Sequence, residues 1–597
     1  MSAILARLLA KRGATIEGLG ANTKVGKIVR SRGVSDGPEL KRIRDLPRRQ
    51  WDEDEEELAE LVALMTKWLK TPHGTQTLRP MQAAVLKELY DYGRVVNVAN
   101  VGEGKSLLSA LAPTVLDSKR PLLFNFAKLV DKARREFMVM AHDWKVCRHY
   151  EFFNYEKLGL VQYDTFLDRL CPDFVCADES HAFRRESSGR TKRFKEWRKK
   201  CPDVPFLPLT GTPGEASVKD PAHIVGWAMG DTSPFPRSQG EIKLWSEALD
   251  VNVDEFRRLH PGALMTLEDS ALPSTLENAR AVFGRRIEQT PGFVAKRTAS
   301  VACSLYLQAL VFNDYAPATE RLCEDVRGKN STPDGKEFRE GVILGTIMKW
   351  ASCGFFYLID PDPPAEWREA RRQWGAFCRD DLHYNRSRRF TPLQVALACS
   401  KGEIDARAYN AWKAIEPTFK PHHVTQWIDL APIHRMIKWM NDEGGLVWTP
   451  YRAVGDKISE LTGVPYFANG GLCARTGRNI ETYKDGPAVL SVEANKLGRN
   501  LQDRWSKELV VGGISSADDL NQVMGRVHRP GQKADACEIT FFWGCYESAA
   551  TLYKARKRAE FDRDVGRNTS NKLLLCDWLV PSESELEDYS GSRWEKE

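Results

Sequence analysis

The sequence predicts an α/β protein with two parallel sheets covered by helices, a mostly helical insertion between them and a helical C-terminal extension. Three observations lead to this prediction. Short apolar runs alternate with helical stretches in two separate parts of the chain, which is typical of parallel strands buried on both faces. Between those parts, helical periodicity is interrupted by proline-rich segments. The chain has 597 residues, which is too long for a single core.

The first element is basic. Residues 1–50 hold twelve Lys/Arg against four Asp/Glu, a net charge of +8, whereas the whole chain carries +6. Such an excess favours either a solvated tail or an arm that follows a phosphate backbone, and the sequence leaves both open. We assign residues 1–50 as a basic N-terminal arm.

Two sets of apolar segments predict the strands of two lobes. The first lobe, residues 51–225, contains RVVNVAN, PLLFNFA, FVCADE and PFLPLTG. The second, residues 431–560, contains GGLVWTPY, PAVLSVEAN, KELVVGG and EITFFWG. Residues 226–430 are expected to form the helical insertion, and residues 561–597 the helical extension.

Composition excludes several classes of protein. The chain is 42% hydrophobic and 28% charged, as in ordinary globular domains. No apolar run reaches the roughly 18 residues that a membrane span needs. The thirteen cysteines include no CxxC pair, which argues against a zinc ribbon or a disulfide framework and favours a reducing cytosol. We therefore expect a cytoplasmic protein with no membrane association.

The segment ANVGEGKS fits a phosphate-binding loop in which Ala99 replaces the usual first glycine. It follows a predicted strand and precedes a helical stretch, as this loop requires. Lys105 would reach the β- and γ-phosphates of ATP, and Ser106 would bind Mg²⁺. Backbone N–H groups of the loop would face the phosphates. The residues expected to form this cradle are Gly102, Glu103, Gly104, Lys105 and Ser106.

A second acidic signal ends a predicted strand, where Asp178 is followed by Glu179. A carboxylate at a strand end can hold Mg²⁺ through water, the role expected of Asp178. Its neighbour Glu179 would orient or deprotonate the attacking water. The alternative is a simple acidic turn, which the upstream phosphate-binding loop disfavours.

Three strings resemble motifs of superfamily 2 helicases. DESH resembles the DExH box, LTGTP the third motif, and LRPMQ the element that reads the base. The resemblance implies that Gln82 reads adenine. It also implies that Thr210 and Thr212 link the state of the nucleotide to the grip on DNA.

The string QVMGRVHRPGQ, residues 522–532, matches QxxGRxxRxGQ of the Snf (Swi/Snf)-type members of that superfamily. Arg526 and Arg529, three apart, are expected on one face of a helix. The resemblance implies that they are arginine fingers acting on the γ-phosphate. A basic surface helix, the alternative, would not account for Gln522 and the two glycines.

The string SVEANKLGRNLQ resembles motif V of the same family, with Ser491 and Asn500 at matching positions. Asn495 and Lys496 replace two glycines, and Lys496 would add a phosphate contact. The segment GGISSADDLNQ lacks the Asp and the Trp-Asn-Pro string usual in nucleosome remodellers. The compact build and the divergent motif V resemble helicases of phages or mobile elements, in which case the protein would act in the host cytoplasm.

The resemblance implies two RecA-like lobes that clamp ATP and Mg²⁺ and move the protein along DNA, duplex or forked, without regard to sequence. The strand and helix near residues 538–561 resemble the brace that packs back on the first lobe. Three alternatives stay open: an RNA helicase, an ATP-gated nucleic-acid clamp that does not translocate, and the motor subunit of a restriction system, although no nuclease motif is present.

Overall fold

The computed structural model describes residues 33–49, 55–99, 102–254, 257–268, 272–295, 301, 303–332, 341–384, 391–569 and 571–575. The chain divides into two compact units. Unit 1 comprises residues 1–299 and 557–571, and unit 2 comprises residues 300–556 and 572–597. Residues 1–32 of the expected basic arm and the expected extension from residue 576 onward lie outside the described residues.

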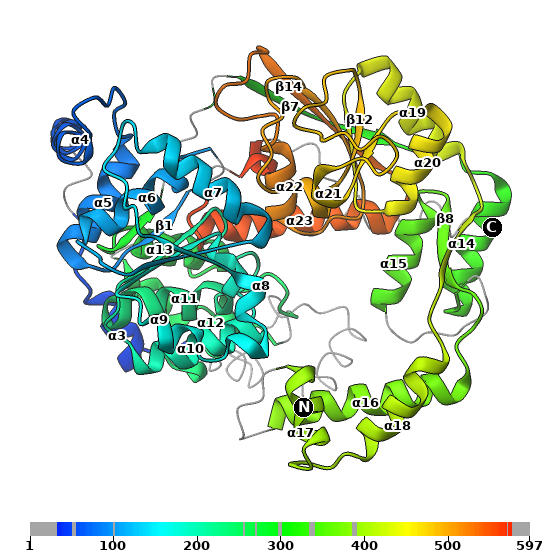
Figure 1. Cartoon of the computed structure of the whole chain (residues 1–597), viewed down its shortest axis with the longest axis horizontal. Coiled ribbons are helices and arrows are strands. Elements are labelled where there is room, and N and C mark those ends of the chain that lie inside the picture. The colour runs from blue at the N-terminus through cyan, green and yellow to red at the C-terminus, as the bar shows by residue number, and fades with distance from the viewer. Residues whose placement is uncertain are drawn as a thin grey trace. The chain divides into compact units, whose positions relative to one another are not determined.

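Unit 1 is built on a six-stranded parallel sheet with the order β3-β2-β4-β5-β1-β6 (Figure 1). Its strands are β1 (Val96–Val98), β2 (Pro121–Asn125), β3 (Glu151–Asn154), β4 (Phe174–Asp178), β5 (Phe206–Thr210) and β6 (Phe293–Ala295). Its helices are α3 (Pro38–Arg44), α4 (Glu55–Leu69), α5 (Pro80–Tyr92), α6 (Lys105–Val115), α7 (Ala127–Met140), α8 (Tyr155–Leu158), α9 (Phe166–Leu170), α10 (Gly189–Lys200), α11 (Lys219–Met229), α12 (Gln239–Leu249) and α13 (Leu276–Glu288).

Successive residues of the central strands of this sheet face opposite cores, because side chains alternate along a strand. Leu123 packs into the core formed with α4, α5, α6 and α7. Leu122 and Phe124 pack into the core formed with α10, α11, α12 and α13. Burial on both faces explains why these strands are continuously apolar.

The end of the expected basic arm is part of unit 1. Arg49 is buried, and its guanidinium donates to Glu88 at 2.6 Å and to the carbonyl oxygens of Glu288 and Phe293 at 2.7 Å each. Leu40 and Ile43 of α3 lie in the core. Residues 33–49 are therefore not a solvated tail, because Leu40, Ile43 and Arg49 are buried in unit 1.

Unit 2 is built on a second six-stranded parallel sheet with the order β11-β12-β10-β13-β14-β7. Its strands are β7 (Ser304–Val311), β10 (Leu446–Thr449), β11 (Tyr466–Phe467), β12 (Ala488–Ser491), β13 (Lys507–Val511) and β14 (Ala536–Trp543), and an antiparallel ribbon joins β8 (Phe355–Ile359) to β9 (His423–Trp427). Its helices are α14 (Pro317–Lys329), α15 (Gly341–Ala351), α16 (Ala365–Tyr384), α17 (Pro392–Ser400), α18 (Arg407–Ile415), α19 (Ala431–Glu443), α20 (Arg452–Thr462), α21 (Val492–Asn495) and α22 (Ala517–Met524). The predicted α/β class with two parallel sheets is thus confirmed.

Four strands, β6, β7, β8 and β9, fall inside the range that was expected to be a helical insertion, 226–430, and two of them belong to the large sheets. Strand β6 extends the sheet of unit 1 beside β1, and β7 extends the sheet of unit 2 beside β14. Both are edge strands. β6 has only three residues, and most side chains of β7 are exposed, so neither carries the apolar run that marks a buried strand. The insertion proper is therefore shorter, with α16, α17 and α18 between β8 and β9.

The last long helix, α23 (Tyr546–Asp564), begins in unit 2, and from Lys557 its residues belong to unit 1. Phe561 lies in the core of unit 1, with the guanidinium of Arg280 5.3 Å from its ring centroid. This agrees with the expected brace helix. Across the described parts of the chain, no helix is both long and apolar enough to cross a membrane.

Candidate functional site

The predicted phosphate-binding loop follows β1, and α6 begins at Lys105. Gly102 and Gly104 both have a φ of +88°, a conformation that favours glycine. A Cβ on Gly104 would collide with Nε2 of Gln82. The same Nε2 donates to the carbonyl oxygen of Glu103 at 3.4 Å. Gln82 therefore lies against the loop, although the two residues before Gly102 lie outside the described residues.

Lys105 is paired with the acid at the end of β4. Its Nζ lies 3.0 Å from Oε1 of Glu179, and both side chains are more than 90% buried. His181 Nδ1 lies 3.4 Å from the other oxygen of Glu179. Burial alone would raise the pKa of Glu179, but Lys105 and His181 together hold it below its usual range. Glu179 is therefore a carboxylate at neutral pH.

The backbone at Glu179 is in the left-handed region, with a φ of +54°. This conformation is uncommon for residues other than glycine, and it is concentrated at functional sites. Tyr155 holds the turn from the other side, since its hydroxyl donates to the carbonyl oxygen of Asp178 at 2.7 Å. The strained turn directs the Glu179 carboxylate at Lys105.

Asp178 is a second buried carboxyl in this site. Burial and the neighbouring Glu179 carboxylate raise its pKa to about 6. Its Oδ2 accepts a hydrogen bond from Asn125 Nδ2 at 3.2 Å. Its Oδ1 is buried and accepts no hydrogen bond from the part of the chain that the structure describes. A nearby cation would stabilise the charged form of this carboxyl.

The donor set at this edge fits Mg²⁺ carried with a nucleotide. Mg²⁺ prefers hard oxygen ligands and is usually held by one or two carboxylates together with substrate phosphates. Asp178 supplies such a carboxylate, and Ser106, half-buried at the start of α6, supplies a hydroxyl. Among the described residues, no group of three or more His, Cys, Asp or Glu could hold a metal ion by itself.

The two threonines of the third motif lie at the end of β5, beside β1 in the sheet. Thr210 Oγ1 accepts a hydrogen bond from the Thr212 N–H at 3.1 Å, which closes the turn. The Thr212 carbonyl accepts from Arg184 at 3.1 Å, and Arg184 also pairs with Glu215 at 2.9 Å. Arg558 lies 3.7 Å from the other oxygen of Glu215. Both threonines are buried, so their side chains act through this network.

The two predicted arginine fingers lie after a helix instead of on its face, because α22 ends at Met524 and Gly525 caps it. The two guanidinium groups nevertheless share one hydrogen-bond acceptor. Arg526 donates to the carbonyl oxygen of Arg499 at 2.9 Å, and Arg529 donates to the same oxygen at 3.2 Å. The spacing of Arg526 and Arg529 predicted that they lie on one face of a helix. In the structure, the turn after α22 brings them to one carbonyl oxygen instead.

These two arginines differ in burial. Arg526 is 2% exposed and also donates to Oε1 of Gln522 at 3.0 Å. Arg529 is half-buried and donates to Oδ1 of Asn500 at 2.8 Å. Arg526 therefore helps to hold unit 2 together through its hydrogen bonds, whereas the guanidinium of Arg529 is more accessible.

The motif V segment turns tightly although two glycines are replaced. Asn495 is buried and donates to the carbonyl oxygens of Phe467 and Ser491 at 2.9 and 3.1 Å. Lys496, expected to contact phosphate, lies 3.0 Å from Asp519 and 2.8 Å from Glu493. A phosphate would have to compete with both carboxylates for it.

The structure thus brings the predicted site residues together in two groups. The group in unit 1 consists of Gln82, Gly102, Glu103, Gly104, Lys105, Ser106, Asp178, Glu179, Thr210 and Thr212. The group in unit 2 consists of Ser491, Lys496, Asn500, Gln522, Arg526 and Arg529. The sequence analysis did not predict a role for Asn125, which donates to Asp178. Asn125 ends β2, the strand that pairs with β4, so its position at the end of a predicted strand could have indicated this role.

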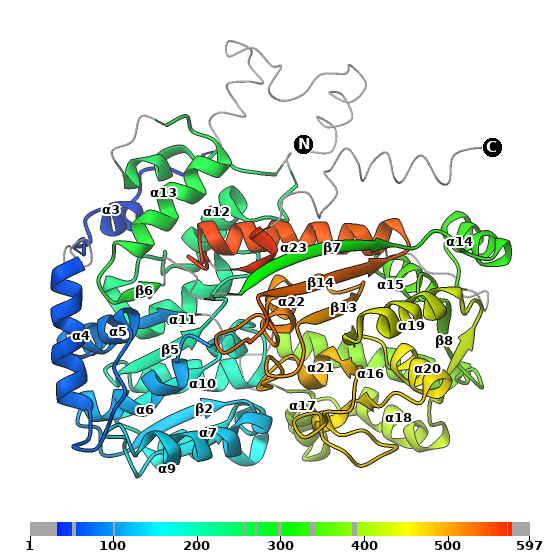
Figure 2. The ribbon, with the colours of Figure 1, turned by 90° about the horizontal axis from the view of Figure 1, so that it is seen from above.

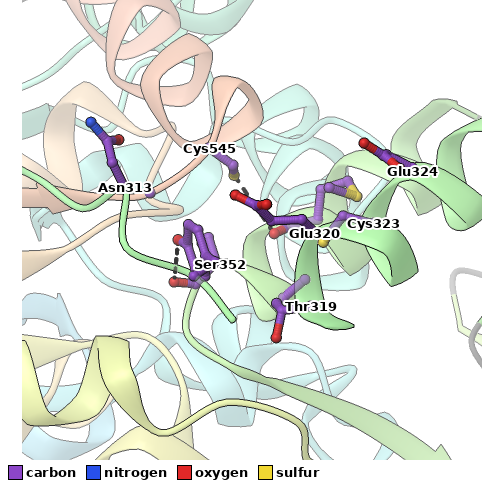
Figure 3. A pocket seen from close by; sticks show the side chains of 11 residues that line it. Asn313, Thr319, Glu320, Cys323, Glu324, Ser352 and Cys545 are labelled. Carbon is purple, nitrogen blue, oxygen red and sulfur yellow. Dashed lines mark hydrogen bonds between the residues drawn. The ribbon is translucent and has the colours of Figure 1, made fainter. Parts of the chain in front are cut away.

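A separate cavity of about 110 Å³ lies in unit 2, beyond the ends of β7 and β14 (Figure 3). Glu320, Cys323, Ser352 and Cys545 line it, and no predicted site residue does. Burial raises the pKa of the Cys545 thiol to about 11 and that of Cys323 to about 12. Both thiols are protonated at neutral pH, so they are poor nucleophiles.

Comparison with known proteins does not supply a family, since no family model and no curated protein matches the chain.

Proposed function

We propose that the chain is an ATP-dependent DNA translocase or helicase of the superfamily 2 kind, with Mg²⁺ as the cofactor of ATP. The buried Lys105–Glu179 pair supports the proposal most, because it joins the lysine expected to bind phosphate to a carboxylate at the carboxyl ends of parallel strands. Ligands of open α/β sheets bind at that edge. Gln82 lies against the same loop.

In this proposal the γ-phosphate of ATP takes the place of Glu179 as the partner of Lys105. Glu179 is then released as a base, already ionised at neutral pH, to orient or deprotonate the attacking water. Ser106 and Asp178 would hold Mg²⁺, whose charge neutralises the phosphates. The strained turn at Glu179 fixes the carboxylate before the nucleotide arrives.

Arg529 and Arg526 of unit 2 are proposed to stabilise the charge that develops on the transferred phosphoryl group. Closure of the two units on ATP would then couple hydrolysis to movement, with Thr210, Thr212 and the 491–500 segment relaying the nucleotide state to the DNA. The choice of DNA rests on the Snf-type strings, which also disfavour an RNA helicase.

The test is ATP hydrolysis by the full chain with single-stranded DNA, duplex DNA, forked DNA and RNA in parallel. We expect DNA to stimulate turnover and RNA to do so far less. Stimulation by RNA alone would identify an RNA helicase. Nucleotide-dependent DNA binding with no turnover would identify a clamp, and no hydrolysis or nucleotide binding under any condition would refute the proposed site.

A second assay separates translocation from unwinding. Contacts to the phosphate backbone carry no sequence information, so movement should not depend on sequence. We expect the protein to displace the third strand of a triplex and to separate tailed duplexes weakly. Strong unwinding without triplex displacement would favour a conventional helicase.

A further inference from the structure

Residues 360–384 and 391–422 form a small helical subdomain that is joined to the rest of unit 2 by one antiparallel ribbon. Strands β8 and β9 pair from Phe355–Trp427 to Ile359–His423, so the two ends of the subdomain are held together. Helix α16 packs against α17 and α18 (Figures 1 and 2). A core that includes Cys378, Val395 and Cys399 fixes this packing.

A groove of about 600 Å³ runs along α16 and reaches α18. Arginine and tryptophan side chains dominate its lining. All four arginines are exposed, two of the three indole rings are half-buried and the third, that of Trp367, is buried. These side chains are Arg368, Arg371, Arg372, Arg379, Trp367, Trp374 and Trp412. The groove therefore joins four cations to aromatic rings, whereas a small-molecule pocket carries only a small number of polar groups.

The order of residues along α16 places its groove arginines and its acidic side chains on different sides of the helix. At 3.6 residues per turn, its four groove arginines fall within an arc of about 100°. The acidic residues Glu366, Glu369, Asp380 and Asp381 fall on the remainder of the helix surface. With a rise of 1.5 Å per residue, Arg368 and Arg379 are about 16 Å apart along the axis. That length matches about five phosphates of a strand that keeps the 3.4 Å spacing found in stacked duplex DNA.

Three of these arginines keep their charge available. Within the described ranges, no carboxylate lies within ion-pair distance of Arg368, Arg371 or Arg379, whereas Arg372 pairs with Glu369 at 2.6 Å. The guanidinium of Arg371 lies 5.2 Å from the ring centroid of Trp367. Stacking on that ring orients the cation without neutralising it.

We propose that this groove binds a single strand of nucleic acid, with the arginines on the phosphates and the accessible parts of the Trp374 and Trp412 rings against the bases. Non-specific single-strand sites combine a cationic track with aromatic rings in this way. The bases of an intact duplex would not reach recessed indole rings. The choice of DNA over RNA as the strand rests on the proposed function. The proposal that the groove binds a single strand rests on the groove residues alone.

The test uses the full chain without nucleotide and measures the anisotropy of labelled oligo(dT) and of a hairpin duplex over a salt series. The variant is Arg368→Gln/Arg371→Gln/Arg379→Gln. A matched control, Arg407→Gln/Lys438→Gln/Arg452→Gln, removes the same charge from exposed side chains of unit 2 that pair with nearby Asp residues and do not line the groove.

We expect the groove variant to bind oligo(dT) about tenfold or more weakly. The slope of log K against log salt should fall by about two, because each phosphate of a single strand that the protein neutralises adds about 0.7 to it. Duplex binding should change less, and the control should match the wild type.

An unchanged oligo(dT) slope overturns the proposal. Labelled poly-glutamate is measured in the same assay, and if the groove variant loses poly-glutamate binding alone, the groove takes an acidic protein segment. If the slope falls although the wild type never hydrolyses ATP, the groove stands and the proposed function fails.

Discussion

Nζ of Lys105 lies 3.0 Å from Oε1 of Glu179, so the lysine that should bind phosphate is held by the acid that should activate water. Each residue neutralises a buried charge of the other. Removal of either one therefore takes this ion pair from its buried partner as well as changing the chemistry of the site.

We expect Lys105→Ala and Glu179→Gln both to abolish ATP turnover but to differ in binding. Glu179→Gln keeps the phosphate cradle and should retain ATP, whereas Lys105→Ala should not. Turnover and the affinity for a labelled ATP analogue measure the two effects. Lys87→Ala, a half-buried lysine of α5 that pairs with Asp91, serves as the control. Near-normal turnover in Glu179→Gln would show that the base has been misassigned.

Arg529→Ala should lower turnover by roughly 10³-fold or more while ATP affinity is largely kept, because an arginine finger acts in the transition state. Its melting temperature should shift by less than about 2 °C. Arg526→Ala should lose turnover and also melt earlier, since Arg526 is buried on Gln522 and Arg499. Wild-type turnover in Arg529→Ala would leave that residue a purely structural role.

Glu508 of β13 makes unit 2 sensitive to pH. Burial raises the pKa of its carboxyl to about 8, despite a 2.9 Å hydrogen bond from the indole of Trp448 and the charge of Arg526. Because the folded pKa lies above the ordinary value of 4.5, this carboxyl contributes its full stability below about pH 4.5 and loses it as the pH rises through about 8.

Glu508→Gln keeps an oxygen for the Trp448 indole and cannot ionise. The variant should therefore be the more stable protein at about pH 9, by a few kcal/mol at about 1.4 kcal/mol for each pKa unit. Urea unfolding followed by tryptophan fluorescence at about pH 5, 7 and 9 measures the difference, with the exposed Glu460→Gln as control. Parallel pH profiles for Glu508→Gln and wild type would contradict the assignment.

Deletion of residues 1–32 tests the basic arm, since residues 33–49 are needed by unit 1. The deleted segment carries seven Lys/Arg and one Glu. If about four of these cations meet phosphates, the slope of log K against log salt for duplex DNA should fall by about 3–4. An unchanged slope would identify a solvated tail.

The sequence by itself determined the two α/β lobes and the candidate ATP site. Strands buried on both faces are continuously apolar, and phosphate chemistry requires particular residues at fixed spacing, so both are visible in a linear string. Each of the eight predicted apolar segments contains a strand, among them PLLFNFA and KELVVGG. The edge strands β3, β6, β7 and β11 escaped prediction because they are short or partly exposed.

Only the tertiary structure decided how the predicted residues are held. It paired Lys105 with Glu179, placed Arg526 and Arg529 on a turn, and committed Lys496 to Asp519. It also set Arg49 in the core of unit 1 and lined one groove with the arginines of α16. These features depend on contacts between residues far apart in the chain or on side-chain directions, and hydrophobic periodicity contains neither.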